Sequence, residues 1–149
     1  MKIQLVKELN KDTSNTITHK CVKLADIISV EPASCSEIIV GDLLDYCNNK
    51  AEMFKQLISK LRYDGVINIS GLDLDILCNE YNNGYLTPYE MVGLLYSNKV
   101  SIDTLYGVVA MCKHHGLDVI IEDISDKSYI VSAKRIKNGE SNQQNTYIV

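Results

Sequence analysis

The chain has 149 residues, a net charge of −4 and a hydrophobic fraction of 46%, values that fit one globular domain with its own core. No apolar run is long enough for a membrane span, and charges interrupt the N-terminal apolar residues, so we expect a cytoplasmic protein without membrane contact. The basic residues are dispersed, which argues against a nucleic-acid binder.

The cysteines are widely spaced and form no C-x-x-C pair, so the sequence indicates neither a zinc site nor a redox motif, and we expect no metal ion. Their odd number and the expected location favour reduced thiols that pack as small hydrophobic side chains. The five residues are Cys21, Cys35, Cys47, Cys78 and Cys112.

The N-terminal part of the chain gives weak signals. Residues 2–9 are short and β-prone, and residues 10–15 form a polar loop. Two further short strands are expected, one at residues 21–24 and one at residues 27–30.

Clear secondary-structure patterns begin at Ser36. The apolar run at residues 37–40, ended by Gly41, is typical of a strand buried on both faces. Asn48 and Asn49 are good N-caps for a helix whose apolar residues follow at helical spacing. Residues 66–71 then predict a second strand, parallel to the first because a helix joins them.

The remaining elements are three helices and a hairpin. Residues 73–81 predict a short helix, Thr87 with Pro88 and Glu90 predicts a second, and Ser101 is the expected N-cap of a third. Residues 117–122 and 129–135 predict two strands joined by a tight turn. We therefore expect one α/β domain over residues 1–136 and a polar tail over residues 137–149, whose last three residues, Tyr147, Ile148 and Val149, could pair with a neighbour but more simply form a frayed end.

Two segments within residues 36–136 carry a family resemblance. Residues 36–46 (SEIIVGDLLDY) resemble a fourth-strand motif, D-E-I-x-x-x-D-V-L-E-H, and residues 57–69 (LISKLRYDGVINI) resemble L-x-x-L-K-P-G-G-x-L-x-I. Residues 25–27 and 115–119 resemble the approaches to the third and sixth strands. In their order, these motifs resemble the C-terminal half of class I S-adenosylmethionine-dependent methyltransferases.

The resemblance implies a truncated Rossmann-like sheet, mostly parallel, with a C-terminal antiparallel hairpin and helices on both faces. Such enzymes hold S-adenosylmethionine on a glycine-rich turn after the first strand, where the backbone approaches the ligand closely. This chain has no glycine before Gly41. The resemblance thus makes S-adenosylmethionine a possible cofactor, but the missing turn favours no cofactor.

The candidate site lies where the parallel strands end, because ligands of open α/β sheets bind there. In the family, the positions of Asp42 and Tyr46 lie near the cofactor and the methyl acceptor, which makes them the candidate catalytic residues. A carboxylate at Asp42 could orient an acceptor or take its proton; alternatively, Asp42 caps a turn and Tyr46 packs with its hydroxyl exposed. The candidate cofactor-binding residues are Gly41, Asp45, Ser70 and Gly71.

Other polar residues have simpler explanations. Asp73 and Asp75 could pair but more simply cap a helix, and the adjacent His114 and His115 point in different directions on a helix. A group of tyrosines between the second predicted strand and the hairpin is either a protein interface or a partly buried layer. These tyrosines are Tyr81, Tyr85, Tyr89, Tyr96 and Tyr106.

Two functions remain open on this reading. The first is a methyltransferase-like protein that has lost S-adenosylmethionine binding of its own and acts as an interaction or assembly module. The second is a methyltransferase acting on a small molecule or glycan, completed by a partner chain. A third, weaker possibility is another nucleotide-like ligand at the same strand ends. Because a truncated sheet exposes an edge, we expect a homodimer or a hetero-complex through that edge.

Overall fold

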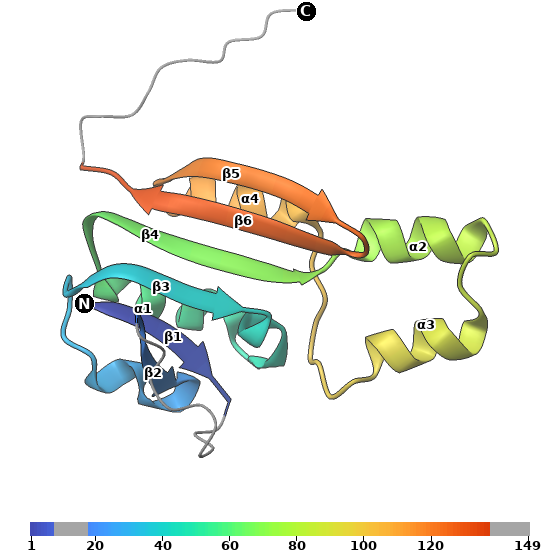
Figure 1. Cartoon of the computed structure of the whole chain (residues 1–149), viewed down its shortest axis with the longest axis horizontal. Coiled ribbons are helices and arrows are strands. Elements are labelled where there is room, and N and C mark those ends of the chain that lie inside the picture. The colour runs from blue at the N-terminus through green and yellow to red at the C-terminus, as the bar shows by residue number, and fades with distance from the viewer. Residues whose placement is uncertain (8–17, 138–149) are drawn as a thin grey trace, which may run out of the picture.

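The protein is described by a computed structural model that covers residues 1–7 and 18–137. Six strands form one sheet in the order β2-β1-β3-β4-β6-β5 (Figure 1). The strands are β1 Lys2–Val6, β2 Lys20–Lys23, β3 Cys35–Gly41, β4 Leu61–Leu72, β5 Leu117–Ser125 and β6 Ser128–Arg135. The helices are η2 Leu24–Ser29, η3 Leu43–Tyr46, α1 Lys50–Lys60, α2 Leu74–Asn82, α3 Pro88–Leu95 and α4 Leu105–His114, where η marks a 3-10 helix.

The sheet is mostly parallel, as predicted. Strands β2, β1, β3 and β4 pair in parallel, whereas β6 runs antiparallel to both β4 and β5. The closing β5–β6 hairpin is therefore confirmed, and its tight turn passes through Asp126 with a positive φ of 55°.

The core lies between one face of this sheet and helices α1 and α4. Ile38 of β3 and Ile67 of β4 are fully buried, and they pack with Phe54 and Leu57 of α1 and with Val108 of α4 in one hydrophobic cluster. The buried residues alternate along the strands, as expected where side chains point to opposite faces of a sheet.

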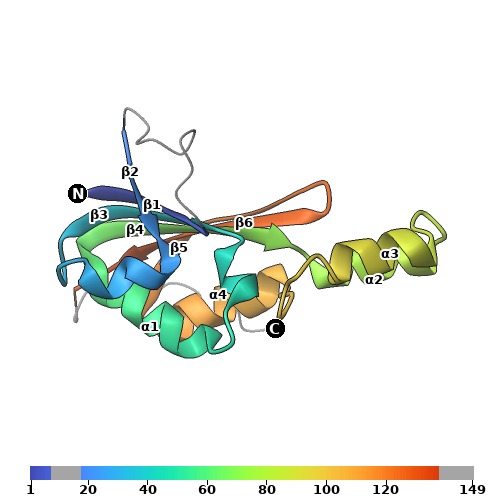
Figure 2. The ribbon, with the colours of Figure 1, turned by 90° about the horizontal axis from the view of Figure 1, so that it is seen from below.

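The helices differ from the prediction in their placement. Figure 2 shows α1 and α4 against the same face of the sheet, while α2 and α3 extend past its end. Within the described residues no helix covers the other face, so the expectation of helices on both faces is wrong there. The other face instead carries a polar chain across β1, β3, β4 and β6.

This polar chain explains why the open face needs no cover. Lys2 pairs with Glu37 at 2.8 Å, Asn68 donates to Glu37 at 3.2 Å, and Ser132 donates to Asn68 at 2.7 Å. Each polar group finds a partner on a neighbouring strand, and such pairs stabilise a sheet face that borders water.

Local structure near two predicted boundaries also differs. The strand expected at residues 27–30 is wrong: residues 24–29 form η2, which buries Ile27 and leaves Ile28 exposed. The N-cap of α4 is Thr104 rather than Ser101: the Thr104 hydroxyl accepts from the Gly107 amide, whereas the Ser101 amide donates to the Asp45 carbonyl.

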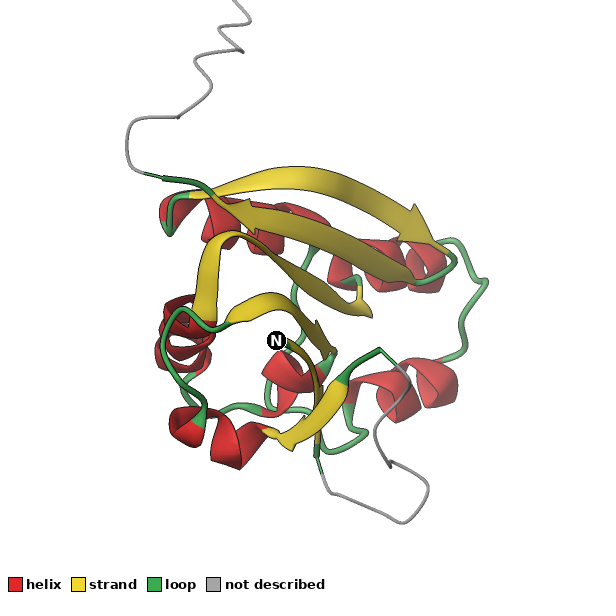
Figure 3. Cartoon of the chain, turned by 60° about the vertical axis from the view of Figure 1, so that its left-hand side comes forward, coloured by secondary structure: helices red, strands yellow, loops and turns green. Residues whose placement is uncertain are grey.

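The other helix starts match the sequence patterns. Asn49 caps α1, Asp73 caps α2, and Thr87 with Glu90 forms the predicted capping box of α3 (Figure 3 shows these helices in red). None of the described helices is long and apolar enough to cross a membrane. Residue 137 is exposed, and the remainder of the predicted tail, with its last three residues, lies outside the described residues.

All five cysteines are free thiols, and their burial predicts their reactivity. Cys35 and Cys112 are fully buried and Cys78 is exposed. Burial raises the pKa of Cys112 to about 11, so its reactive thiolate form is scarce near neutral pH. With Ellman's reagent at mildly alkaline pH, we expect fast labelling of Cys78 and labelling of Cys35 and Cys112 only after denaturant is added.

The variant Cys78→Ser is the control for this assignment. It should remove the fast labelling phase and leave the slow thiols unchanged. Rapid labelling of Cys112 in the folded protein would contradict the packing of α4 against the sheet.

Candidate functional site

A hollow of about 450 Å³ lies at the carboxyl ends of β3 and β4. These parallel strands end at the same edge of the sheet, so the residues that follow them meet there. The hollow is lined by Gly41, Asp42, Tyr46, Ser70, Gly71, Leu72, Ser97, Lys99 and Ser128. Five of the six candidate site residues therefore share one hollow, and the sixth, Asp45, is buried.

Gly41 ends β3 in a left-handed conformation, with φ of 62°. No atom lies within 4 Å of the place where a Cβ would stand, so the backbone turn, rather than crowding, favours glycine at this position. The turn leads into η3, which positions Asp42, Asp45 and Tyr46 on one short segment.

Gly71 has a different role. A Cβ at this position would lie 2.8 Å from the hydroxyl oxygen of Tyr129, whose side chain is buried on β6. Glycine therefore lets the Tyr129 ring pack across β4. This contact explains Gly71 by packing alone, without any ligand.

The ammonium of Lys99 occupies the centre of the site. Its Nζ lies 2.7 Å from Asp45 Oδ2 and 3.1 Å from Asp42 Oδ2. The side chains of Lys99 and Asp45 are only 5% and 1% exposed, whereas Asp42 is about half exposed. The ion pair thus joins the loop after α3 to the end of β3.

A second lysine reaches the same carboxylate. Lys50 Nζ lies 3.5 Å from Asp45 Oδ1 and also pairs with Asp103. The backbone carbonyl of Asp45 accepts from the amides of Val100 and Ser101. Asp45 therefore holds the segment between α3 and α4 through both its side chain and its backbone.

Burial and ion pairing shift the pKa values of Asp45 and Lys99. Burial raises the pKa of Asp45, and the two lysine ammoniums oppose that shift. Burial works to lower the pKa of Lys99, but hydrogen bonds to Asp45 and Asp42 outweigh it, so the pKa of Lys99 is raised. At neutral pH Lys99 is thus charged, and its charge is matched by carboxylates within the chain.

Tyr46 is flanked by cations and touches Asp42. Lys7, just beyond the end of β1, places its Nζ 3.3 Å from the centre of the Tyr46 ring, and Lys99 lies 5.2 Å from it. The Tyr46 hydroxyl donates to Asp42 at 3.5 Å. The two candidate catalytic residues are therefore neighbours, and the ring already contacts ammonium groups of its own chain.

The other polar residues have structural partners. The buried Asp73 carboxylate accepts from the amides of Ile76 and Leu105, at 3.0 and 2.6 Å, so it caps α2 as predicted and also holds the start of α4. His114 and His115 meet edge to face, and burial, followed by the His114 charge, lowers the pKa of His115. In the described part of the chain, no cluster of three metal-binding side chains occurs.

The architecture has counterparts among solved structures. A protein from Pyrococcus horikoshii, PH0226, matches 90% of this chain with a TM-score of 0.60 and 13% identity. An O-methyltransferase family protein from Burkholderia thailandensis matches with a TM-score of 0.58 and 14% identity, over 80% of this chain. This is the class I methyltransferase-like fold. A SAM-dependent methyltransferase from Archaeoglobus fulgidus matches with a TM-score of 0.57 and 12% identity, over 89% of it.

These matches establish the methyltransferase-like fold. The chain covers a different fraction of the length of each matched protein. It covers 36% of the Burkholderia protein, 75% of the Archaeoglobus protein and 71% of the Pyrococcus protein. No protein-family model and no curated protein matches the sequence.

Lys99, which the sequence did not single out, lies 54 residues from Asp45 in a loop without any motif.

The buried ion pair gives a stability prediction. Replacing Lys99 with methionine leaves Asp45 with only the more distant Lys50, and we expect a loss of about 3 kcal/mol in the free energy of unfolding. Because the pKa of Lys99 is raised on folding, its contribution is present below the ordinary lysine pKa and is lost as pH rises through the raised value. Urea denaturation at neutral and strongly alkaline pH measures both effects.

The controls isolate the pair. Lys55→Met, at an exposed position of α1, should change stability little. In a double-mutant cycle, adding Asp45→Asn to Lys99→Met should cost less than the two single losses added together. Additive losses would contradict a direct interaction.

A second prediction concerns Gly71. Gly71→Ala should destabilise the fold by about 1–3 kcal/mol, because the added methyl overpacks against the buried Tyr129 ring. Tyr129→Phe removes the nearest atom and should restore part of the loss. Thermal unfolding of the single and double variants measures both changes in stability. A Gly71→Ala variant as stable as wild type would show that the Tyr129 ring is not held against β4.

Proposed function

We propose that this chain is a methyltransferase-like protein that acts by associating with other protein chains and does not bind S-adenosylmethionine unaided. The observation that carries the proposal is the internal neutralisation of the strand ends, where Lys99 is matched by Asp42 and Asp45. A cofactor entering there would have to displace contacts that the chain already makes.

The hollow fits the cofactor poorly for two reasons. Leu72 is the one aliphatic side chain among its lining residues, which include Asp42, Lys99 and three serines, whereas ligand pockets are lined mostly by apolar side chains with a few polar groups that fix orientation. In addition, the Tyr46 ring, the aromatic surface among the lining residues, already contacts the ammonium of Lys7. The absence of glycine before Gly41 agrees with both points, since a close backbone approach to a ligand favours glycine.

Exposed apolar surface supports the association. Ile120, Ile121 and Ile124 on the edge strand β5 are exposed, as are several apolar side chains of the α2–α3 region. Apolar side chains gathered on a surface mark interaction sites more often than isolated ones do.

The second candidate function is S-adenosylmethionine-dependent methyl transfer completed by a partner chain. It is favoured by the position of the hollow, since Asp42, Tyr46 and Ser70 meet at the strand ends where ligands of this sheet type bind. In that case the cofactor would supply the methyl group, Asp42 would orient the acceptor, and the partner would supply the missing cofactor contacts.

Titration calorimetry with S-adenosylmethionine separates the two functions. For the full chain alone we expect no binding in the micromolar range, because the charged groups at the strand ends are already paired. Micromolar binding would overturn the proposal. If such binding were lost in Tyr46→Ala and kept in the control Tyr106→Ala, the strand-end hollow would be the cofactor site and the second function would be favoured.

A further inference from the structure

The helices α2 and α3 form an arm that extends past the end of the sheet (Figures 1 and 2). Its root is fixed on both sides: Asp73 caps α2, and the segment after α3 is held by Asp45. The outer helix, α3, has eight residues and buries none of them. Met91, Leu94 and Leu95 are half-buried, so α3 packs on one side, and its opposite side has no cover within the described residues. Since short helices depend on packing for their stability, covering that opposite side would stabilise α3.

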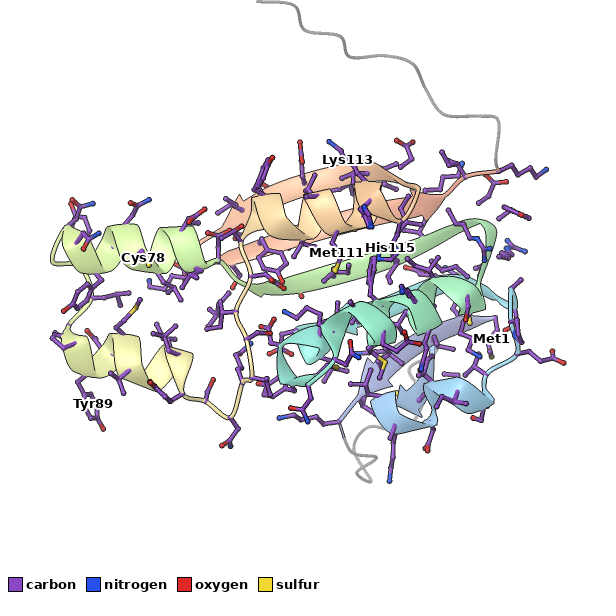
Figure 4. All side chains as sticks on the ribbon, turned by 180° about the vertical axis from the view of Figure 1, so that it is seen from behind. Met1, Cys78, Tyr89, Met111, Lys113 and His115 are labelled. Carbon is purple, nitrogen blue, oxygen red and sulfur yellow. The ribbon has the colours of Figure 1, made fainter. Side chains whose placement is uncertain are left out.

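One side of α3 carries an exposed apolar stripe, of which Gly93 also borders a shallow hollow shared with Leu86 and Lys127. Tyr89, Val92, Gly93 and Tyr96 are spaced i, i+3, i+4 and i+7, the spacing of a helix face that normally packs against a core. All four are exposed, with Tyr89 at 88% and Tyr96 at 79%. Figure 4 shows Tyr89 directed away from α2. We call these four residues the α3 stripe.

The α3 stripe is self-complementary. A two-fold axis between residues 92 and 93 pairs two antiparallel copies so that Tyr89 of one lies beside Tyr96 of the other. The same operation places Val92 of one copy opposite Gly93 of the other, a projecting side chain against a gap. Such mutual pairing is what a two-fold interface between identical chains requires.

Gly93 supports this arrangement independently. Glycine within a helix costs roughly 1 kcal/mol relative to alanine, yet a Cβ at Gly93 would meet no atom within 4 Å in its own chain. Packing within the chain therefore gives no reason for glycine. Close approach of a second helix gives one.

Charge and area also agree with a second copy. The α3 stripe contains no charged residue, and the antiparallel pairing places Glu90 of one copy opposite position 95 of the other, which is Leu95, so the two Glu90 carboxylates are not opposed. Each exposed tyrosine can bury on the order of 150 Å². With Tyr85, Tyr89, Val92 and Tyr96, the two copies would bury roughly 1,000–1,200 Å², near the lower limit of specific interfaces.

We propose that the chain forms a two-fold homodimer through the α3 stripe, with α3 crossing its counterpart at Gly93. This inference rests on the association proposed above and names its partner as a second copy. It places the contact on the helical arm instead of the sheet edge expected from the sequence. The modest area predicts dissociation in the micromolar range.

Sedimentation velocity over a micromolar concentration series tests the dimer. Wild type should show a concentration-dependent dimer. Gly93→Leu puts bulk at the crossing point while favouring the helix, so it should weaken the dimer at least tenfold without lowering the thermal stability of the monomer. A monomeric wild type at several hundred micromolar would overturn the inference.

A matched pair of variants locates the contact. Tyr89 and Tyr106 are both the second residue of their helix, and they are 88% and 80% exposed. Tyr89→Glu should dissociate the dimer, and Tyr106→Glu on α4 should leave it intact. A dimer that survives both Gly93→Leu and Tyr89→Glu would overturn the α3 stripe as the interface while leaving the proposed association standing.

The two proposals fail separately. Calorimetric binding of S-adenosylmethionine contradicts the proposed function, whatever the oligomeric state. A wild-type chain that does not self-associate contradicts the α3 dimer, whatever the calorimetry shows. So does a dimer that dissociates in Tyr106→Glu but not in Tyr89→Glu.

Discussion

The buried carboxylate of Asp45 is the point on which the helical half of the molecule depends. Its side chain pairs with Lys99 and Lys50, and its backbone carbonyl holds the segment that returns from α3 to α4. Removing a carboxylate from water is costly unless charges and hydrogen bonds compensate it. Here the compensation comes from residues distant in sequence, so the same contacts that satisfy Asp45 also fix the arm to the strand ends.

The contacts of Asp45 connect the strand-end hollow to the arm formed by α2 and α3. Lys99 lines the hollow and also belongs to the segment that joins α3 to α4. On the other side of the arm, Asp73 joins the start of α2 to the start of α4. Two buried aspartates therefore set the direction in which α3 projects, and movement of the arm would disturb the lining of the hollow.

Much of the fold was predictable because its signals are local. Thr87, Pro88 and Glu90 form the expected capping box, and the apolar run before Gly41 forms β3. The open face was missed although β4 carries a signal, since Asn68 and Ser70 alternate with apolar neighbours as on a sheet with one wet face. The role of Lys99 was not predictable, because no short-range pattern links a loop lysine to a carboxylate 54 residues away.

The polar open face and the exposed arm together indicate that a second protein chain covers the arm, rather than that a layer of helices is missing from the sheet. The polar groups of Lys2, Glu37, Asn68 and Ser132 pair with one another, so this part of the open face is stable beside water. The α3 helix differs: apart from Glu90 its residues are apolar, and none of them is fully buried. Covering the exposed apolar side of the arm therefore gains free energy, and the proposed pairing with a second α3 helix is one way to cover it.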